Sequence, residues 1–238
     1  VIGDSGQCAV SQTGCNDATA VMNQYLAWVA QNGGNLADLV LILGDNAYNN
    51  GSDTEYTTGL FEVFGNVLRN HVLWPVPGNH EFGFSDSGTQ SGPYYEAFVL
   101  PTAGEAGGLA SGTEAYYSFD FANIHFVALD SHDTSRAAPV SPQTNICPGD
   151  EGGAMYNWLC DDLAANNQDW TISLWHHPSY TKGSHDSDVE GQLEEMREKF
   201  NPVIESHGVD LNFTGHSHSY ERSILLDGHY GVSGTFDP

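Results

Sequence analysis

The chain has 238 residues and a formal net charge of −25 at pH 7, because 31 Asp and Glu stand against only 6 Lys and Arg. Nucleic-acid binding through phosphates and adsorption to anionic membranes both need clustered Lys and Arg, so this charge balance argues against both kinds of partner. With 39% hydrophobic and only 16% charged residues, the composition is typical of a globular chain rather than a disordered one. No apolar run reaches the roughly 18 residues of a membrane span, so we expect no insertion into a membrane.

The chain begins with Val1-Ile2-Gly3-Asp4, the pattern of a strand that is already under way. Two strand residues make a poor beginning, so we expect a trimmed chain or a fragment that lacks part of its first strand and its last strands. Removal of a signal peptide is the alternative explanation. The sequence shows no repeat, low-complexity tract or linker, so we expect a single domain over residues 1–238.

The first predicted elements alternate between helix and strand. Asp17 can cap a helix that Gly33-Gly34 ends. Four apolar residues of this helix follow helical spacing: Val21, Tyr25, Trp28 and Val29. The continuous apolar run 39–43 predicts a strand buried on both faces. A second strand is predicted from His71 to Val76, just before Pro77-Gly78.

The second half of the chain continues this alternation. Residues 116–120 and 124–130 predict a hairpin that turns near Ala122-Asn123. Further elements follow in order: a helix at 151–167, a strand at 170–175, a helix at 189–207, a strand at 209–213 and a possible hairpin of 224–226 with 229–232. The order of strands and helices along the chain predicts an α/β fold.

The four cysteines are even in number and lie in loop-rich surroundings, which favours two disulfides. Of the three possible pairings we expect Cys8–Cys15 and Cys147–Cys160. Four free thiols in a cytosolic protein are the alternative. No cysteine lies in a CxxC motif, so a zinc knuckle or a thioredoxin-like site is not expected.

Polar residues gather just after the carboxyl ends of the predicted strands: Asp4, Asp45, Asn79-His80, His176-His177, and His216 with His218. Each of them alone has an ordinary explanation, such as a helix cap, a turn or a buried core histidine. Open α/β sheets bind their ligands at this edge, however, so we expect these side chains to lie together. His216 and His218 are two residues apart, and on extended backbone such side chains point to the same side.

The chemistry of this set is that of a metal site. Two carboxylates, an amide oxygen, a phenol and three imidazoles form a mixed shell that suits first-row transition ions and suits calcium or copper(I) poorly. A central carboxylate can bridge two ions about 3.5 Å apart, and such pairs activate water for in-line displacement at phosphorus. The residues therefore predict metal-assisted hydrolysis of phosphoesters.

Five motifs in chain order resemble the signature of the calcineurin-like metallophosphoesterases: Gly3-Asp4-Ser5-Gly6, Gly44-Asp45-Asn46-Ala47-Tyr48, Gly78-Asn79-His80-Glu81, His176, and Gly215-His216-Ser217-His218. Within that superfamily the chain is similar to the purple acid phosphatases, because its first motif reads Asp-x-Gly and its second carries Tyr48. The stretch from about Asn201 to Arg222 also resembles that family. The resemblance implies a β-sandwich of two mixed sheets flanked by helices, in an α/β/β/α arrangement.

The resemblance also implies a role for each site residue. Four residues form a first metal site that would hold Fe(III): Asp4, Asp45, Tyr48 and His218. Four form a second site, which would hold Zn, Mn or Fe(II) and shares the bridging carboxylate: Asp45, Asn79, His176 and His216. His80 matches a residue that faces the substrate phosphate. His185, nine residues after His176, matches a proposed general acid.

These roles imply an acid phosphatase that hydrolyses small phosphate monoesters, with a metal-bound hydroxide as the nucleophile. Phosphodiesterase or nucleotidase activity on the same scaffold stays open, as does a non-catalytic extracellular domain that keeps the fold. We expect a secreted protein and predict no particular oligomeric state. Most of the acidic residues have no basic partner, which we interpret as adaptation of the surface to saline or acidic surroundings.

Overall fold

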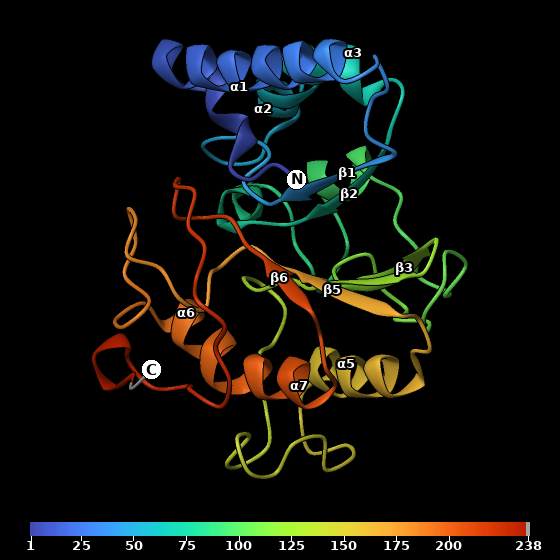
Figure 1. Cartoon of the computed structure of the whole chain (residues 1–238), viewed down its shortest axis with the longest axis vertical. Coiled ribbons are helices and arrows are strands. Elements are labelled where there is room, and N and C mark those ends of the chain that lie inside the picture. The colour runs from blue at the N-terminus through green and yellow to red at the C-terminus, as the bar shows by residue number, and fades with distance from the viewer. Residues whose placement is uncertain (237–238) are drawn as a thin grey trace.

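The computed structural model describes residues 1–236 as two β-sheets packed face to face and covered by helices on both outer sides (Figure 1). Residues 237–238, the last two of the predicted single domain, lie outside the described residues. Helices α1, α2 and α3 lie over the smaller sheet, and α5, α6 and α7 lie beneath the larger one. The predicted α/β/β/α sandwich is confirmed.

The smaller sheet contains β1 (Leu39–Leu43) and β2 (Val72–Val76). The two strands are parallel, and Leu43 at the end of β1 pairs with Val76 at the end of β2. Ile2 forms a parallel bridge with Ile42 on the other side of β1, so the first residues of the chain do extend this sheet. β1 is almost completely buried, as its continuous apolar run predicts. Because β1, β2 and the Ile2 segment are parallel, the chain leaves the sheet at the same edge after each of them.

The larger sheet has the order β3-β4-β5-β6. β3 (Tyr117–Phe121) and β4 (Ile124–Ala128) form the predicted hairpin, with Ala122 in the left-handed region at its turn. β5 (Trp170–Leu174) and β6 (Leu211–Phe213) add to it in parallel. The carboxyl ends of β5 and β6 therefore lie at the same edge of the larger sheet, next to the carboxyl ends of β1 and β2 (Figure 1).

Aromatic side chains join the two sheets. The rings of Trp74 on β2 and Phe119 on β3 stack with their centroids 3.6 Å apart, and Phe119 stacks in turn on Phe126 of β4 at 4.7 Å. Tyr117 on β3 donates a 2.7 Å hydrogen bond from its hydroxyl to the carbonyl oxygen of Pro75 on β2. This apolar interface fixes the relative position of the two sheets and hence of the loops at their shared edge.

Helices of very different length cover the sheets. α1 (Gln12–Gln31) crosses the smaller sheet together with α2 (Asp53–Glu55) and α3 (Glu62–Leu68), which a π-helical segment joins. α5 (Ala154–Ala165), α6 (Gly191–Glu195) and α7 (Asn201–Ser206) cover the larger sheet, and a second π-helical segment links α6 to α7. A short α4 (Pro93–Ala97) and three 3₁₀ turns complete the helical segments of the described residues: 5–9, 79–83 and 233–235.

The predicted start of α1 is wrong, and two of the four apolar residues named for this helix lie on its exposed side. The helix cap lies six residues earlier, at Ser11, whose hydroxyl accepts a 2.9 Å hydrogen bond from the Gly14 N–H. Val21 and Trp28 are 60% and 58% exposed, whereas Met22 and Val29 are buried. Apolar residues lie on more than one side of this helix, so their spacing alone does not show which side packs against the sheet.

The helix predicted at about 189–207 is confirmed over residues 191–206, where α6, the π-helical segment and α7 follow one another. Its start is two residues later than predicted, and Val189 lies outside it with 74% of its surface exposed. One prediction near the C-terminal end is wrong. The segment 224–232 contains no strand, so the possible hairpin of 224–226 with 229–232 does not form. β6 is consequently the last strand of its sheet among residues 1–236.

Both expected disulfides are present, Cys8–Cys15 and Cys147–Cys160, and no cysteine is free. Among the described residues, none of the helices combines the length and the apolar character that crossing a membrane requires.

Candidate metal centre

The predicted metal ligands come together at the shared carboxyl edge of the two sheets. Asp4, Asp45 and Asn79 follow the Ile2 bridge, β1 and β2 of the smaller sheet. His176 follows β5, and His216 and His218 follow β6 of the larger sheet. Residues that are as much as 214 positions apart in the sequence thus meet because parallel strands end at one edge.

One cluster of donor atoms surrounds the hydroxyl of Tyr48. This oxygen lies 3.3 Å from Asp4 Oδ1, 3.0 Å from Asp45 Oδ2 and 2.9 Å from His218 Nε2. His218 Nε2 and Asp4 Oδ1 are 3.5 Å apart. Donor atoms that share one ion at about 2.1 Å lie about 3 Å apart around it, so these four side chains have the spacing of a single coordination shell.

A second cluster surrounds His176. Its Nε2 atom lies 3.1 Å from Asn79 Oδ1, 3.1 Å from His216 Nδ1 and 3.4 Å from Asp45 Oδ2. Asp45 Oδ2 is therefore close to donor atoms of both clusters, to Tyr48 in the first and to His176 in the second. A carboxylate placed in this way can bridge two ions.

Hydrogen bonds outside the clusters decide which atoms face them. His176 Nδ1 lies 2.8 Å from the carbonyl oxygen of Leu43, which can only accept, so Nδ1 donates and Nε2 keeps its lone pair for an ion. The backbone N–H of His80 donates to Asp45 Oδ1 at 3.0 Å and leaves Oδ2 for the clusters. A Cβ atom at Gly78 would lie 2.3 Å from Asp45 Oδ1, so only glycine fits between the loops after β1 and β2.

Four of these residues hold their backbone in the left-handed region: Asp4, Asp45, His216 and His218. For residues other than glycine this conformation costs of order 1–3 kcal/mol each, and such residues concentrate at functional sites. These residues follow the Ile2 bridge, β1 and β6, so the backbone strain is concentrated where the two donor clusters lie.

The pKa shifts of the cluster residues show that positive charge is favourable at this site. Burial raises the pKa of Asp4, and burial together with Asp45 and Asp4 raises the pKa of Tyr48 far above its usual range. Burial alone would lower the pKa of His176, but Asp45 outweighs it and the pKa is raised to about 9. The carboxylates around His176 therefore favour positive charge at this position. The donor set therefore fits positively charged ions, and its mixture of oxygen and nitrogen fits transition metals.

The two predicted substrate-facing histidines lie beside the clusters, His80 against the Tyr48 ring and His185 against the His216 ring. His80 donates from Nδ1 to the carbonyl oxygen of Asn49 at 2.6 Å, and its Nε2 is 3.9 Å from Asp45 Oδ2. The His185 ring lies over the His216 ring with centroids 3.8 Å apart. Both imidazoles are partly exposed, so each can reach a molecule that enters from solvent.

Two further acids belong to this site, although sequence reasoning gave them no role. Glu81 is buried and accepts hydrogen bonds of 2.6–3.3 Å from four backbone N–H groups: those of Asp45, Asn46, Ala47 and Gly78. It thereby ties the loop after β1 to the loop after β2. Burial, with Asp45 adding to it, raises the pKa of Glu81 to about 7. The available signal was an acid inside a motif whose other polar residues, Asn79 and His80, were predicted to belong to the metal centre.

Glu190 contacts two histidines of the site, His185 and His216. Its carboxylate lies 2.9 Å from His185 Nδ1 and 3.5 Å from His216 Nε2, and it accepts a 2.9 Å bond from the Asp186 N–H. Nothing in the sequence distinguishes Glu190 from the neighbouring Glu194 and Glu195, because the distinction arises from the turn that precedes α6.

The sequence of this chain is similar to those of known phosphoesterases. The sequence pattern of the family described as calcineurin-like phosphoesterase matches residues 1–220. Purple acid phosphatase 15 of Arabidopsis thaliana is 28% identical over 215 residues, which cover 79% of this chain and 36% of the relative. Purple acid phosphatase 1 of Ipomoea batatas is 30% identical over 238 residues, which cover 94% of this chain and 42% of the relative.

A solved structure of a purple acid phosphatase from yellow lupin (Lupinus luteus) seeds has a similar fold. It superposes with a TM-score of 0.52 at 18% identity, covering 84% of this chain and 33% of that chain. The chain therefore spans about two fifths or less of the length of these relatives.

Proposed function

Because this chain belongs to the calcineurin-like phosphoesterase family, we propose that it hydrolyses small phosphate monoesters at a centre of two metal ions. Membership of this family implies a dimetal centre. The observation that carries the proposal is the position of Asp45 Oδ2, within 3.0 Å of Tyr48 and 3.4 Å of His176 and hence shared by two donor clusters. We further propose that residues 1–238 form one catalytic domain that is exported from the cell, since it holds two disulfides.

Each cluster has the donors for one ion. Fe(III) is proposed for the cluster with the Tyr48 phenol, since hard anionic oxygens suit a hard trivalent ion: Asp4, Asp45, Tyr48 and His218. Zn, Mn or Fe(II) is proposed for the cluster with more neutral donors: Asp45, Asn79, His176 and His216. When bound, two such ions supply an activated water and hold the phosphate oxygens for in-line displacement.

His80 is proposed to bind an oxygen of the substrate phosphate. Its ring is held from both sides, by the hydrogen bond of Nδ1 to Asn49 and by contact with the Tyr48 ring at 4.3 Å between centroids. Since Nδ1 donates to Asn49, Nε2 is the atom that remains, and it can donate a hydrogen bond to a phosphate oxygen when the ring is an imidazolium. A held imidazole binds without losing much side-chain entropy.

His185 is proposed to give a proton to the leaving oxygen. Glu190 engages its Nδ1, so its Nε2 is the nitrogen available to the substrate. The ring lies against His216 and is partly exposed, so it can be reprotonated from solvent after each turnover. Glu190 is a positioning residue in this scheme, because it fixes His185 relative to a proposed metal ligand.

The test of the proposal is the rate of hydrolysis of p-nitrophenyl phosphate compared with that of bis(p-nitrophenyl) phosphate by protein loaded with iron and zinc. We expect a higher kcat/KM on the monoester. A higher value on the diester would support a phosphodiesterase on the same scaffold instead. Hydrolysis of neither compound by protein that binds two ions would support a non-catalytic domain.

A further inference from the structure

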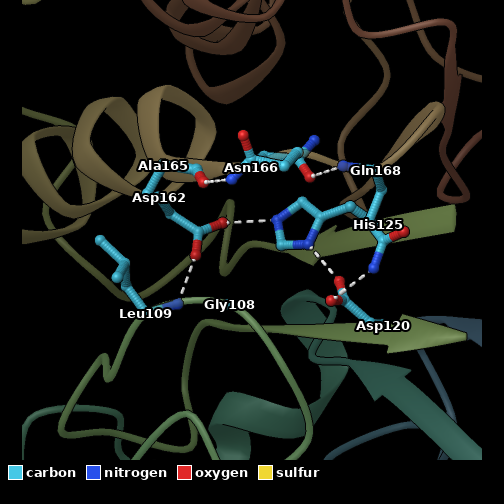
Figure 2. A pocket seen from close by; sticks show the side chains of 9 residues that line it. Gly108, Leu109, Asp120, His125, Asp162, Ala165, Asn166 and Gln168 are labelled. Carbon is cyan, nitrogen blue, oxygen red and sulfur yellow. Dashed lines mark hydrogen bonds and ion pairs between the residues drawn. The ribbon is translucent and has the colours of Figure 1, made fainter. Parts of the chain in front are cut away.

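A second cluster of titratable side chains lies far from the metal centre, at the opposite edge of the larger sheet. His125 on β4 faces Asp120 on β3, its direct cross-strand partner, and Asp162 on α5 (Figure 2). On β5 its partner is Thr171, five residues before His176, which corresponds to about 16 Å along a strand. The cluster lines a cavity of about 260 Å³ together with residues of the 108–109 and 165–168 segments.

The hydrogen bonds of His125 determine its charge. Its Nδ1 lies 2.7 Å from Asp120 Oδ1 and its Nε2 lies 2.8 Å from Asp162 Oδ2. Figure 2 shows the ring between the two carboxylates, with one nitrogen directed at each. A neutral imidazole carries a single N–H, so both bonds exist together with ionised carboxylates only if His125 is an imidazolium.

The remaining bonds of the two acids are those of ionised carboxylates. Asp162 Oδ1 accepts from the Leu109 N–H at 2.7 Å and from the Ser118 hydroxyl at 2.8 Å. Asp120 Oδ2 accepts from the side-chain amide of Gln168 at 2.8 Å. The Asp162 side chain is 0% exposed and that of His125 is 2% exposed, whereas Asp120 is 32% exposed. The buried positive charge thus faces one buried and one partly hydrated negative charge.

This cluster connects four parts of the chain. β3, β4 and α5 each supply one charged group, and the Leu109 N–H joins the glycine-rich loop at 104–109 to them. That loop lies directly against the cluster, because a Cβ atom at Gly108 would lie 2.8 Å from Asp162 Oδ1. Removing one charge from such a buried network leaves its partners without compensation, which is strongly destabilising.

We propose that the Asp120–His125–Asp162 cluster is a proton-dependent clamp, which holds the β3–β4 hairpin, the 104–109 loop and α5 together when His125 is protonated and loosens when it is not. This inference does not depend on the proposed function. Asp120 and Asp162 are the titratable groups that act on His125 from the elements packed against it. After loss of the proton the ring can donate to only one of the two carboxylates, so one of them is left without its partner.

The direction of the pH dependence follows from linkage. Burial by itself lowers the pKa of His125, but the hydrogen bonds and charges of Asp162 and Asp120 outweigh it and raise the pKa above its usual 6.5. A group whose pKa is raised by folding contributes its full stabilisation below the unfolded value and loses it as the pH rises through the folded value. The clamp is therefore closed at acidic pH and weakens above about pH 6.5.

The test measures the free energy of unfolding in urea from pH 5 to 9 for the wild type, His125→Gln and Asp120→Asn. We expect the advantage of the wild type over His125→Gln to be constant at low pH and to shrink above about 6.5. His207→Gln is the matched control, because that histidine lies at the end of α7 and has no carboxylate partner among residues 1–236. Its difference from the wild type should lack this pH dependence.

Asp120→Asn keeps the proposal testable if His125→Gln fails to fold, because position 120 is partly exposed and Asn keeps an acceptor oxygen. In this variant the His125 NMR titration should move to lower pH, and the Leu109 amide should lose its exchange protection at a lower pH than in the wild type. A wild-type His125 that titrates at or below 6.5 would overturn the clamp. So would an advantage over His125→Gln that stays constant from pH 5 to 9.

Discussion

At the scale of single residues, the centre depends on which atom of each side chain is already engaged. The carbonyl of Leu43 occupies His176 Nδ1, and the N–H of His80 occupies Asp45 Oδ1. The atoms left over, His176 Nε2 and Asp45 Oδ2, are the two that approach each other to 3.4 Å. If His176 Nε2 and Asp45 Oδ2 made these hydrogen bonds instead, the same residues would direct a protonated nitrogen and an already hydrogen-bonded oxygen toward the ion.

Tyr48→Phe tests the assignment of Fe(III) to the first cluster. The variant loses the phenol oxygen that lies within 3.3 Å of Asp4, Asp45 and His218. We expect iron-loaded, oxidised wild type to show a visible phenolate-to-iron absorption band and the variant to lack it. Tyr220→Phe is the control, because that ring is 93% exposed. A wild type that holds iron but is colourless would refute the Tyr48–Fe(III) assignment.

Glu190→Gln tests whether Glu190 positions the proton donor. A leaving alkoxide needs protonation far more than a nitrophenolate does, so we expect kcat/KM for an alkyl phosphate to fall about tenfold more than that for p-nitrophenyl phosphate. Metal content should be measured in the same samples, because Glu190 also contacts His216.

Glu198→Gln is the matched control for this experiment, since Glu198 is exposed on the helical segment that follows. It should leave both rates unchanged. Equal losses on the two substrates in Glu190→Gln, with full metal content, would show that Glu190 does not act through His185.

At the scale of elements, the sequence predicted best what a short apolar run determines. β1 has its predicted bounds, 39–43, because five consecutive apolar residues have no solvent-facing side. The predicted start of α1 was wrong because a serine cap at Ser11 competes with the Asp17 signal, and only packing decides between them. The strand at 209–213 was correctly placed, but its position as the last strand of its sheet depends on contacts that spacing does not encode.

The same distinction holds for the site. Asp4, Asp45, Asn79, His176, His216 and His218 could be placed together because each follows a strand and parallel strands share an edge. Glu81 and Glu190 could not be found, since their roles arise from hydrogen bonds between loops that are distant in sequence. The position of Asp45 between two clusters likewise depends on the backbone of His80, which fixes the orientation of its carboxylate.

Glu81→Gln tests the connection between the loops after β1 and β2. The carboxylate accepts four backbone N–H groups, and a glutamine has one acceptor oxygen and places N–H groups against the remaining donors. We expect the free energy of unfolding to fall by about 1–3 kcal/mol and metal affinity to fall with it. The measurement is urea unfolding with and without metal. Glu62→Gln, an exposed acid on α3, should change neither, and an equally small effect of Glu81→Gln would contradict the role of Glu81.

At the scale of the whole molecule, the net charge of −25 concerns the surface more than the site. Of the six basic residues, four form ion pairs among residues 1–236: Arg136, Lys182, Arg197 and Lys199. Two of these four, Arg136 and Lys199, share the single acid Glu195, so most of the 31 acids meet no cation. At physiological ionic strength charges more than about 8 Å apart are largely screened, so distant acids hinder an anionic substrate little.

The surplus of acids predicts a protein that salt stabilises. Raising KCl from 0.1 to 1 M shortens the screening length from about 10 to about 3 Å and removes repulsion among the surface carboxylates. We expect Tm to rise at pH 7, by about 2–4 °C for each kcal/mol of repulsion removed. The rise should be smaller near pH 4, where many of the carboxylates are protonated. A Tm that falls in molar KCl at pH 7 would contradict this interpretation of the surface.

The central claim is that Asp45 joins two metal sites, and the metal content of the wild type and of Asp45→Asn tests it most directly. Asparagine keeps the size of the side chain and removes the charge of the oxygen that lies 3.0 Å from Tyr48 and 3.4 Å from His176. After loading with iron and zinc and removal of free metal, we predict two ions per wild-type chain and at most one per Asp45→Asn chain, with hydrolysis of p-nitrophenyl phosphate lost in the variant. Two ions and near-normal turnover in Asp45→Asn would contradict the account.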